Sequence, residues 1–201
     1  MDMNEIRPVV RPRATTQVAD GLPRLAWTME EFDRLAEYGF FSEDDRIELI
    51  GGELVPMSPK GTQHEAVRDE LLDFLIRRLP NNVRVSIEIG WRPDKQIYVE
   101  PDIVLYPTGF TGNKVPPGEI IVLIEVADTS LSYDTGRKAK IYASLGVREY
   151  WVVNAKTLET IVHLEPGAEG YGKVSAFAPS ETVAPLALPQ LTVSLGALKI
   201  G

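Results

Sequence analysis

The chain of 201 residues is long enough for one domain with a substantial core, and its 44% hydrophobic and 25% charged residues exclude extensive disorder. Cysteine is absent and histidine occurs twice, which excludes disulfides, thiolate metal sites and zinc sites built from several histidines. The net charge of −8 is evidence against broad nonspecific binding of nucleic acids, although a cluster of metal-binding carboxylates lowers the net charge by itself.

Two absences in the sequence indicate the expected location. No apolar run approaches the roughly 18 residues of a membrane span. The first residues, MDMNEIRPVVRPRATTQ, lack the apolar region of a secretory signal. We therefore expect a soluble, cytoplasmic protein with no membrane partner, and the lack of cysteine suits that compartment.

The N-terminal part of the sequence predicts an arm followed by a helix. Residues 1–22 mix Pro, Arg, Thr and Val without periodicity, so we interpret them as a flexible arm before a single domain over residues 23–201. The segment TMEEFDRLAEYG predicts a helix, because Thr28 and Glu31 make a capping box and Gly39 stands where a C-cap belongs.

A β-hairpin is predicted next, in the segment RIELIGGELVPM. Its turn is Gly51-Gly52, a pair that accepts positive φ angles. Strand alternation places Glu48 and Glu53 on one face of the hairpin. Either acid could add a carboxylate to a site, but an exposed hairpin face is the commoner meaning, and we prefer it for Glu48. Glu53 and Glu88 stay open.

The rest of the chain predicts a mixed α/β core. The expected elements are a helix (62–79), strands (83–89, 97–106 and 120–126), a helix (134–145), a strand (149–154) and its hairpin partner (158–164). Pro101 predicts a break or an edge inside the second strand. The crossover from 120 to 154 should be right-handed and parallel. Beyond Pro166 we expect only a β extension of short strands such as 191–195.

Two acids lie in apolar strand sequences. Asp102 opens DIVLY directly after a proline, and Glu125 lies near the end of IIVLIEV. An acid inside an apolar strand is costly unless it is paired or bound to metal. One interpretation is a buried structural salt bridge. The other is a site for a hard cation such as Mg²⁺, which prefers carboxylate oxygens at neighbouring strand ends.

Helical spacing distinguishes two lysines in the helix at 134–145. Lys138 shares a stripe with Ile141, Tyr142 and Leu145, whereas Lys140 lies on the opposite side. Lys138 should therefore face the sheet, where it could orient water or neutralise a phosphate, and Lys140 should face solvent. The alternative for Lys138 is a lysine whose head reaches solvent at the helix margin.

The two histidines have different surroundings in the sequence. His64 lies on the apolar stripe of its helix and near the helix start, where anions are favoured. It is either a hydrogen-bonded core residue or part of the site. His163 lies in the late hairpin, and we interpret it as structural.

Several of these segments together resemble a known family. They are ELIGGELVPMSP, His64 at a helix start, VEPDIVLYP and the long EVADTSLSYDTGRKAKIYASLGVREYWVVNAKTLETIVHL. Over residues 25–195 the chain is similar to the Uma-two family (domain of unknown function 820) of the PD-(D/E)xK superfamily. The resemblance implies a restriction-endonuclease-like core, a helix–three strands–helix–strand order with a mixed sheet.

The resemblance also implies roles for individual residues. The family's Pro-Asp corresponds to Pro101-Asp102 and its second acid to Glu125, which together would bind the metal. The usual in-strand lysine position is Ala127 here, and Lys138 matches a lysine that has moved to the following helix. His64 matches a histidine of the first core helix. The predicted catalytic set is therefore Asp102, Glu125, Lys138 and His64.

The leading hypothesis is an endonuclease that uses Mg²⁺ (or Mn²⁺) to hydrolyse phosphodiester bonds of DNA. A second hypothesis is a noncatalytic accessory or binding module of nuclease fold, for example one associated with mobile elements, which the acidic composition favours. A third is a metal-dependent hydrolase of another phosphoester. The apolar C-terminal segment could serve an interface, so a homodimer is a possible assembly.

Overall fold

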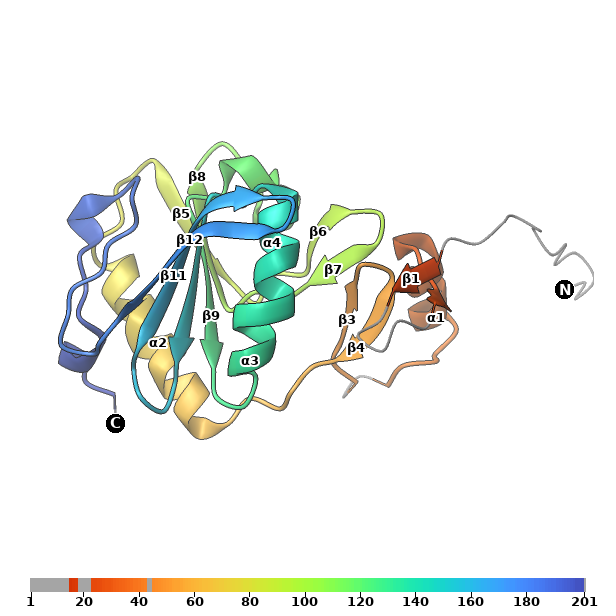
Figure 1. Ribbon diagram of the computed structural model, residues 1–201, viewed down its shortest axis with the longest axis horizontal. Helices are drawn as coiled ribbons and strands as arrows, with labels where there is room; N and C mark the ends of the chain where they lie inside the picture. Colours follow the sequence, from red (N-terminus) through yellow and green to blue (C-terminus); the bar gives the residue numbers. More distant parts are fainter. Residues whose placement is uncertain (1–14, 18–22, 43–44, 201) are drawn as a thin grey trace, which may run out of the picture.

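The main body of the protein is a β-sheet with helices on both faces (Figure 1). The computed structural model describes residues 15–17, 23–42 and 45–200. In that part of the chain the sheet contains six strands: β5 (Val83–Ile87), β8 (Ile103–Pro107), β9 (Val122–Ala127), β10 (Glu149–Asn154), β11 (Thr160–Gly167) and β12 (Gly170–Phe177).

The strand order is β12-β11-β10-β9-β8-β5, and it is a mixed sheet. β9 and β10 pair in parallel, and the other neighbours in this described sheet are antiparallel. The predicted mixed α/β class and the predicted parallel crossover are therefore confirmed. The eight-residue β12 is longer than the short strands expected beyond Pro166.

Each face of the sheet is buried under a different set of elements. Helix α2 (Thr62–Ile76) covers one face through Val67, Leu71 and Leu75, which are at most 1% exposed. The C-terminal segment packs on the same face through Leu191. The other face lies under the helix that ends at Leu145 (Figure 1). This double cover explains why β9 is apolar on both faces.

The helix predicted at 134–145 begins earlier and is not uniform. It consists of α3 (Leu131–Tyr133), a π-helical turn η3 (Asp134–Lys138) and α4 (Ala139–Leu145). It ends as predicted at Gly146, whose φ of 85° is left-handed. Because the π turn has more residues per turn than an α-helix, it changes which side chains face the sheet, and such turns are frequent at functional sites.

A second, smaller sheet adjoins the first at its side (Figure 1). It has the order β4-β3-β7-β6, formed by β3 (Ile47–Ile50), β4 (Glu53–Pro56), β6 (Trp91–Asp94) and β7 (Ile97–Val99). The predicted hairpin is confirmed as β3–β4. The break predicted at Pro101 is also confirmed, because β7 joins this sheet and β8 joins the larger one. Strand β6 was not predicted.

The N-terminal part of the described chain holds two further findings. Helix α1 (Met29–Glu37) has the predicted capping box of Thr28 and Glu31. Most of the predicted arm lies outside the described residues, but Thr15–Gln17 forms β1 and pairs with β2 (Pro23–Leu25).

The strand predicted at 191–195 is wrong. Two 3₁₀ turns, η4 (Pro189–Leu191) and η5 (Leu195–Ala197), flank a single β-bridge between Val183 and Val193. Between β8 and β9, the short turns η1 (Gly112–Lys114) and η2 (Pro117–Glu119) also form. Among the described residues, no helix is long and apolar enough to cross a membrane.

Candidate active site

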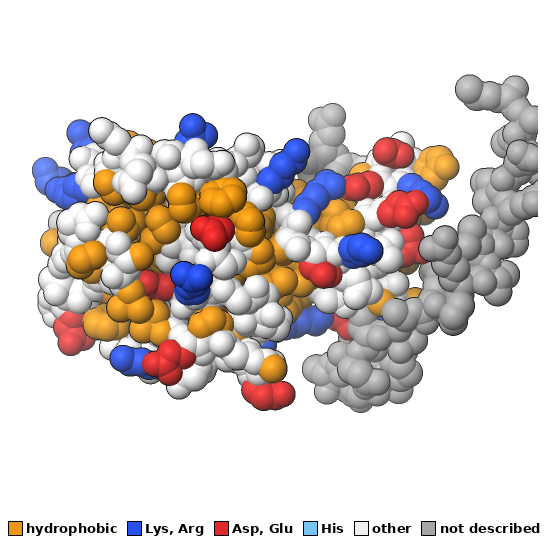
Figure 2. Space-filling model, turned by 90° about the horizontal axis from the view of Figure 1, so that it is seen from above, with side chains coloured by type: hydrophobic (Ala, Val, Ile, Leu, Met, Phe, Trp, Pro, Cys, Tyr) orange, Lys and Arg blue, Asp and Glu red, His pale blue; other side chains and the backbone are white. Residues whose placement is uncertain are grey.

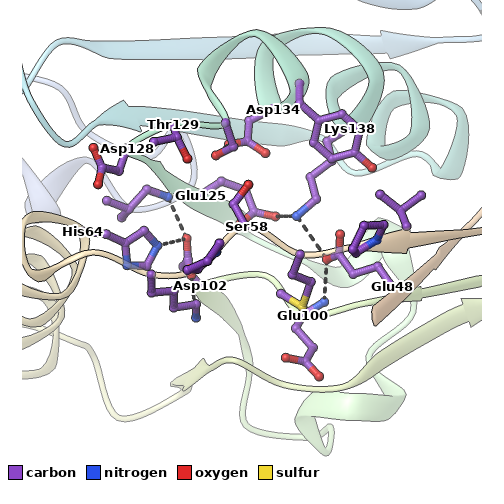
Figure 3. A pocket seen from close by; sticks show the side chains of 18 of the residues that line it. Glu48, Ser58, His64, Glu100, Asp102, Glu125, Asp128, Thr129, Asp134 and Lys138 are labelled. Carbon is purple, nitrogen blue, oxygen red and sulfur yellow. Dashed lines mark hydrogen bonds and ion pairs between the residues drawn. The ribbon is translucent and has the colours of Figure 1, made fainter. Parts of the chain in front are cut away.

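Asp102 and Glu125 lie next to each other at one end of the larger sheet. β8 and β9 are antiparallel with Ile103 opposite Ile124, so the start of β8 lies beside the end of β9. Both acids are buried, at 3% and 4% exposure, and both line a cavity of about 260 Å³. In Figure 3 their side chains point into this cavity, with His64 on one side and Lys138 on the other.

Lys138 enters the cavity from the π turn and contacts two acids. Its Nζ lies 3.0 Å from Oε1 of Glu125 and 3.1 Å from Oε1 of Glu48. Lys138 is buried, whereas Lys140 is exposed. The prediction that Lys138 faces inward and Lys140 faces solvent is therefore confirmed, and the salt bridge and inward lysine expected from the sequence occur together.

Glu48 corrects the sequence interpretation, which placed it on an exposed hairpin face. It is 2% exposed, pairs with Lys138 and accepts a hydrogen bond from the backbone N–H of Glu100 at 3.1 Å. The reason is the second sheet: β3 pairs with β4 on one side and with β7 on the other, and the face that carries Glu48 meets the cavity. The hairpin sequence alone shows no sign of that packing.

His64 and Lys60 hold the other acid. His64 Nε2 lies 3.0 Å from Oδ2 of Asp102, and the backbone N–H of Val126 donates to the same oxygen at 2.8 Å. The Nζ of Lys60 lies 3.1 Å from Oδ1 of Asp102 and 2.7 Å from Oε1 of Glu88. His64 thus belongs to the same cluster as Asp102, while Lys60 comes from the loop before α2 and was not predicted.

The two central acids have opposite pKa shifts. Burial alone would raise the pKa of Asp102, but the hydrogen bond and charge of His64 and the charge of Lys60 outweigh it, so this pKa lies well below its ordinary value. Burial raises the pKa of Glu125 well above its ordinary value, and the opposing charge of Lys138 is offset by neighbouring acids that include Asp102. The cavity therefore holds an excess of acidic groups over cations.

Lys138 and Asp134 show the same imbalance from the helix side. Burial alone would lower the pKa of Lys138, but Glu125, Glu48 and Asp134 together raise it above its ordinary range, so Lys138 stays charged. Burial raises the pKa of Asp134, against the charge of Lys138 and the hydrogen bond from Ser130. Lys138 therefore supplies one positive charge among three buried carboxyl groups.

Two further residues of the cavity region were not assigned to the site from the sequence. Tyr142 is fully buried and donates its hydroxyl to Oε1 of Glu125 at 2.8 Å. Asp134 lines the cavity and precedes Lys138 by four positions. Both lie at helical spacing from Lys138, so the stripe that identified the lysine could also have identified them.

His163 lies away from the cavity, in β11. Its ring packs at centroid distances of 5.2 Å from Tyr150 and 5.5 Å from Tyr171, and burial lowers its pKa. Its Nδ1 lies 3.3 Å from the carbonyl oxygen of Tyr150. These contacts support the structural role expected for it.

The donor atoms of the cavity suit a hard divalent cation. Among the described residues, no group of three or more His, Cys, Asp or Glu side chains is arranged to hold a metal. Mg²⁺, however, is bound in many sites by one or two carboxylates, with water and substrate phosphate completing its shell. Asp102 and Glu125 supply such oxygens, and the excess of buried acids around them favours a positive ion. The residues present therefore fit Mg²⁺ or Mn²⁺.

Comparisons with known proteins identify a family and a fold. Residues 29–196 match the model of the Uma2 family, which is described as "Putative restriction endonuclease". The chain is also similar to a crystal structure from Anabaena variabilis ATCC 29413, described as a "putative nuclease belonging to DUF820". The two share 18% identity with a TM-score of 0.65, over 84% of this chain and 95% of that one. This likeness confirms the predicted restriction-endonuclease-like fold. No curated protein matches the chain.

Proposed function

The chain belongs to the Uma2 family, and from this premise we propose that it is a metal-dependent endonuclease that hydrolyses phosphodiester bonds of DNA. We propose Mg²⁺ or Mn²⁺ as the cofactor, Asp102 and Glu125 as its ligands, and Lys138 and His64 as the other site residues. The family is described as "Putative restriction endonuclease", and the similar crystal structure as a "putative nuclease", which supports this proposal. The metal, the substrate and the residue roles are our inference.

One observation carries the proposal. Lys138 Nζ lies 3.0 Å from Glu125, whose carboxylate shares a buried cavity with Asp102 from the neighbouring strand. Two carboxylates and one inward cation supply ligands for a metal and a positive charge for the phosphoryl oxygens. The position of the usual in-strand lysine is Ala127 in this chain. Lys138, on the following helix, brings its ammonium group to Glu125 instead.

A divalent ion held by Asp102 and Glu125 would supply electrostatic stabilisation of the reacting phosphoryl group. The chain's own residues position the donors. Tyr142 donates to Glu125 at 2.8 Å and fixes the orientation of its carboxylate. His64 and the Val126 backbone do the same for Asp102, at 3.0 and 2.8 Å. Lys138, held charged by its acids, would neutralise charge that develops on a phosphoryl oxygen.

A cleavage assay tests the proposal. Supercoiled, linear duplex and single-stranded DNA are incubated with Mg²⁺, Mn²⁺ or EDTA. We expect cleavage that requires the metal and falls by about 10²–10³-fold in Asp102→Asn, which removes a proposed metal ligand, and in Lys138→Met, which removes the proposed positive charge at the phosphoryl oxygen. Lys140→Met changes the same charge on the solvent side of the same helix and should cleave like the wild type.

Equal cleavage by the wild type and Asp102→Asn would refute the assignment. Cleavage of RNA or of a simple phosphoester in preference to DNA would replace the substrate and leave the metal site in place. The proposed homodimer is a separate point, which light scattering of the purified protein checks.

A noncatalytic nuclease-fold module is the second candidate, and a specific observation favours it. Each central acid already has a lysine within 3.1 Å, so its charge is partly satisfied without a metal. Calorimetric titration with Mn²⁺ distinguishes the two functions. The nuclease requires binding that Asp102→Asn weakens, whereas the accessory module requires neither metal binding nor cleavage.

A further inference from the structure

A wide groove lies beside the candidate active site, with a volume of about 1080 Å³. It lies at the edges of the two sheets. Its lining includes residues of β5, the edge strand of the larger sheet, and of β6, the edge strand of the smaller sheet. Residues of both strands line it, together with residues of the 3₁₀ turn η1. The groove is thus built from parts of the fold that the cavity of Asp102 and Glu125 does not use.

The groove carries positive charge in a protein whose net charge is −8. Arg84, Arg92 and Lys114 line it, and none of the described lining residues is Asp or Glu. Arg84 and Lys114 are exposed, and neither has an ion-pair partner among the described residues. Arg92 pairs with Asp33 at 3.0 Å, but both side chains are more than 40% exposed, so this pair is weak.

This concentration of charge is local. On the face shown in Figure 2, lysine and arginine side chains alternate with acidic ones and form no continuous basic band. The lining of the groove, with three cations and no acid among the described residues, differs from the mixed charge of that face. Such a local patch raises the concentration of an anionic polymer even on an acidic protein.

Neutral donors and small residues complete the groove. Tyr98 and Tyr106 contribute aromatic rings with hydroxyl groups, and the Tyr106 hydroxyl lies 2.7 Å from that of Ser86. A Cβ at Gly112 would lie 2.9 Å from the Ser86 Oγ, and a Cβ at Gly90 would lie 2.9 Å from the Tyr98 ring. Glycine at these two positions therefore keeps side chains from crowding the polar lining.

Two chain segments connect the groove to the cavity. In the first, Tyr98 lines the groove and Glu100 lines the cavity, and the Tyr98 hydroxyl donates to Oε1 of Glu100 at 2.7 Å. In the second, Gly90 lines the groove, and Glu88 pairs with Lys60 of the cavity. The lining of the groove and the lining of the cavity are therefore joined through residues only two positions apart in each segment.

We propose that this groove binds the sugar–phosphate backbone of DNA and delivers it to the cavity of Asp102 and Glu125. Arginine and lysine side chains without ion-pair partners match phosphates, and the Ser86 hydroxyl matches phosphate and sugar oxygens. The inference rests on the proposed function, because DNA is the substrate proposed there. The inference adds a surface that binds the DNA. Such a surface is needed because the acid-lined cavity by itself repels phosphates.

The test measures DNA binding without cleavage. A short fluorescent duplex is titrated with protein in EDTA and in Ca²⁺, over a range of salt concentrations, with fluorescence anisotropy as the readout. The groove variant is Arg84→Ala with Lys114→Ala. The matched control is Lys140→Ala with Lys173→Ala, which removes the same charge from exposed positions on α4 and on β12, the opposite outer strand of the larger sheet.

We expect the groove variant to bind DNA about tenfold or more weakly. The slope of log affinity against log salt should fall by about 2, because each substituted cation neutralises about one phosphate. The control should bind like the wild type. Arg84→Lys, which keeps the charge, should retain most of the binding. Circular dichroism and thermal unfolding show that the variants fold, as expected for exposed side chains without partners.

The outcomes separate this inference from the proposed function. Equal DNA binding by the groove variant and the control, or no DNA binding by the wild type, overturns the groove. Displacement of the duplex by polyglutamate as effectively as by unlabelled DNA would also overturn the proposal. The groove would then bind any polyanion and would not be specific for a sugar–phosphate backbone. If groove-dependent binding holds while no metal-dependent cleavage is found, the groove stands and the nuclease proposal fails.

Discussion

The cavity contains two lysines that each form ion pairs with two acids but differ in their surroundings. Lys138 lies between Glu125 and Glu48, and Lys60 lies between Asp102 and Glu88. Each lysine therefore bridges one of the two proposed metal ligands to a second acid. The four contacts range from 2.7 to 3.1 Å, so distance alone does not distinguish the two clusters.

Their burial does distinguish them. The side chains of Lys138, Glu125 and Glu48 are 8%, 5% and 3% exposed, whereas Glu88 in the other cluster is 33% exposed. Lys138 projects from a helix packed on the sheet, and Lys60 from the loop before α2. A charge in the first cluster has little access to water, so removing one partner should be far more costly there. The predictions below test this difference.

Lys138→Met should have the largest effect on stability. It leaves Glu125 and Glu48 buried without their cation, and removing one partner of a buried pair costs about 3–5 kcal/mol. Denaturant unfolding measures this cost. Lys140→Met is the control and should change stability by less than about 0.5 kcal/mol. A wild-type-like midpoint for Lys138→Met would show that the two acids take up protons without strain.

Tyr142→Phe should have an intermediate effect. It removes the hydroxyl that donates to Glu125 at 2.8 Å but keeps the ring in the core. A hydrogen bond to a charged group contributes about 1.5–3 kcal/mol. If Tyr142 also positions Glu125, metal affinity should fall with stability. Tyr171→Phe is a suitable control, because that hydroxyl donates to the Val147 carbonyl away from the cavity. A lower stability with unchanged metal affinity would contradict the positioning role.

Lys60→Met should have the smallest effect on stability, about 1 kcal/mol. Asp102 keeps the hydrogen bonds from His64 and Val126, and Glu88 keeps Arg68 as a partner. The comparison of the two lysines fails if this variant unfolds as readily as Lys138→Met under the same denaturant conditions.

Much of the fold follows from short-range patterns. The capping box of Thr28 and Glu31, the turn at Gly51-Gly52 and the break at Pro101 all rest on local backbone chemistry, and all are present. Helical phase alone was sufficient to place Lys138 inside and Lys140 outside. In each case the determining interactions lie within a few residues of one another in sequence.

The features that the sequence did not predict depend on long-range packing. Glu48 is buried because β7, some fifty positions later, pairs with its strand. Lys60 reaches Asp102 because a loop with no periodic pattern passes the cavity. The π turn at Asp134–Lys138 has no local signal, and although Pro101 marks the break within residues 97–106, nothing local indicates that β7 joins a second sheet with β3 and β6.

That division at Pro101 has a mechanical consequence. Glu48 and Glu100 belong to the smaller sheet and its margin, while Asp102 and Glu125 belong to the larger one, and one proline separates Glu100 from Asp102. Lys138 forms an ion pair with an acid from each sheet. A change in the angle between the sheets would lengthen one of these ion pairs. The shape of the cavity and the relative orientation of the two sheets are therefore coupled through a single ammonium group.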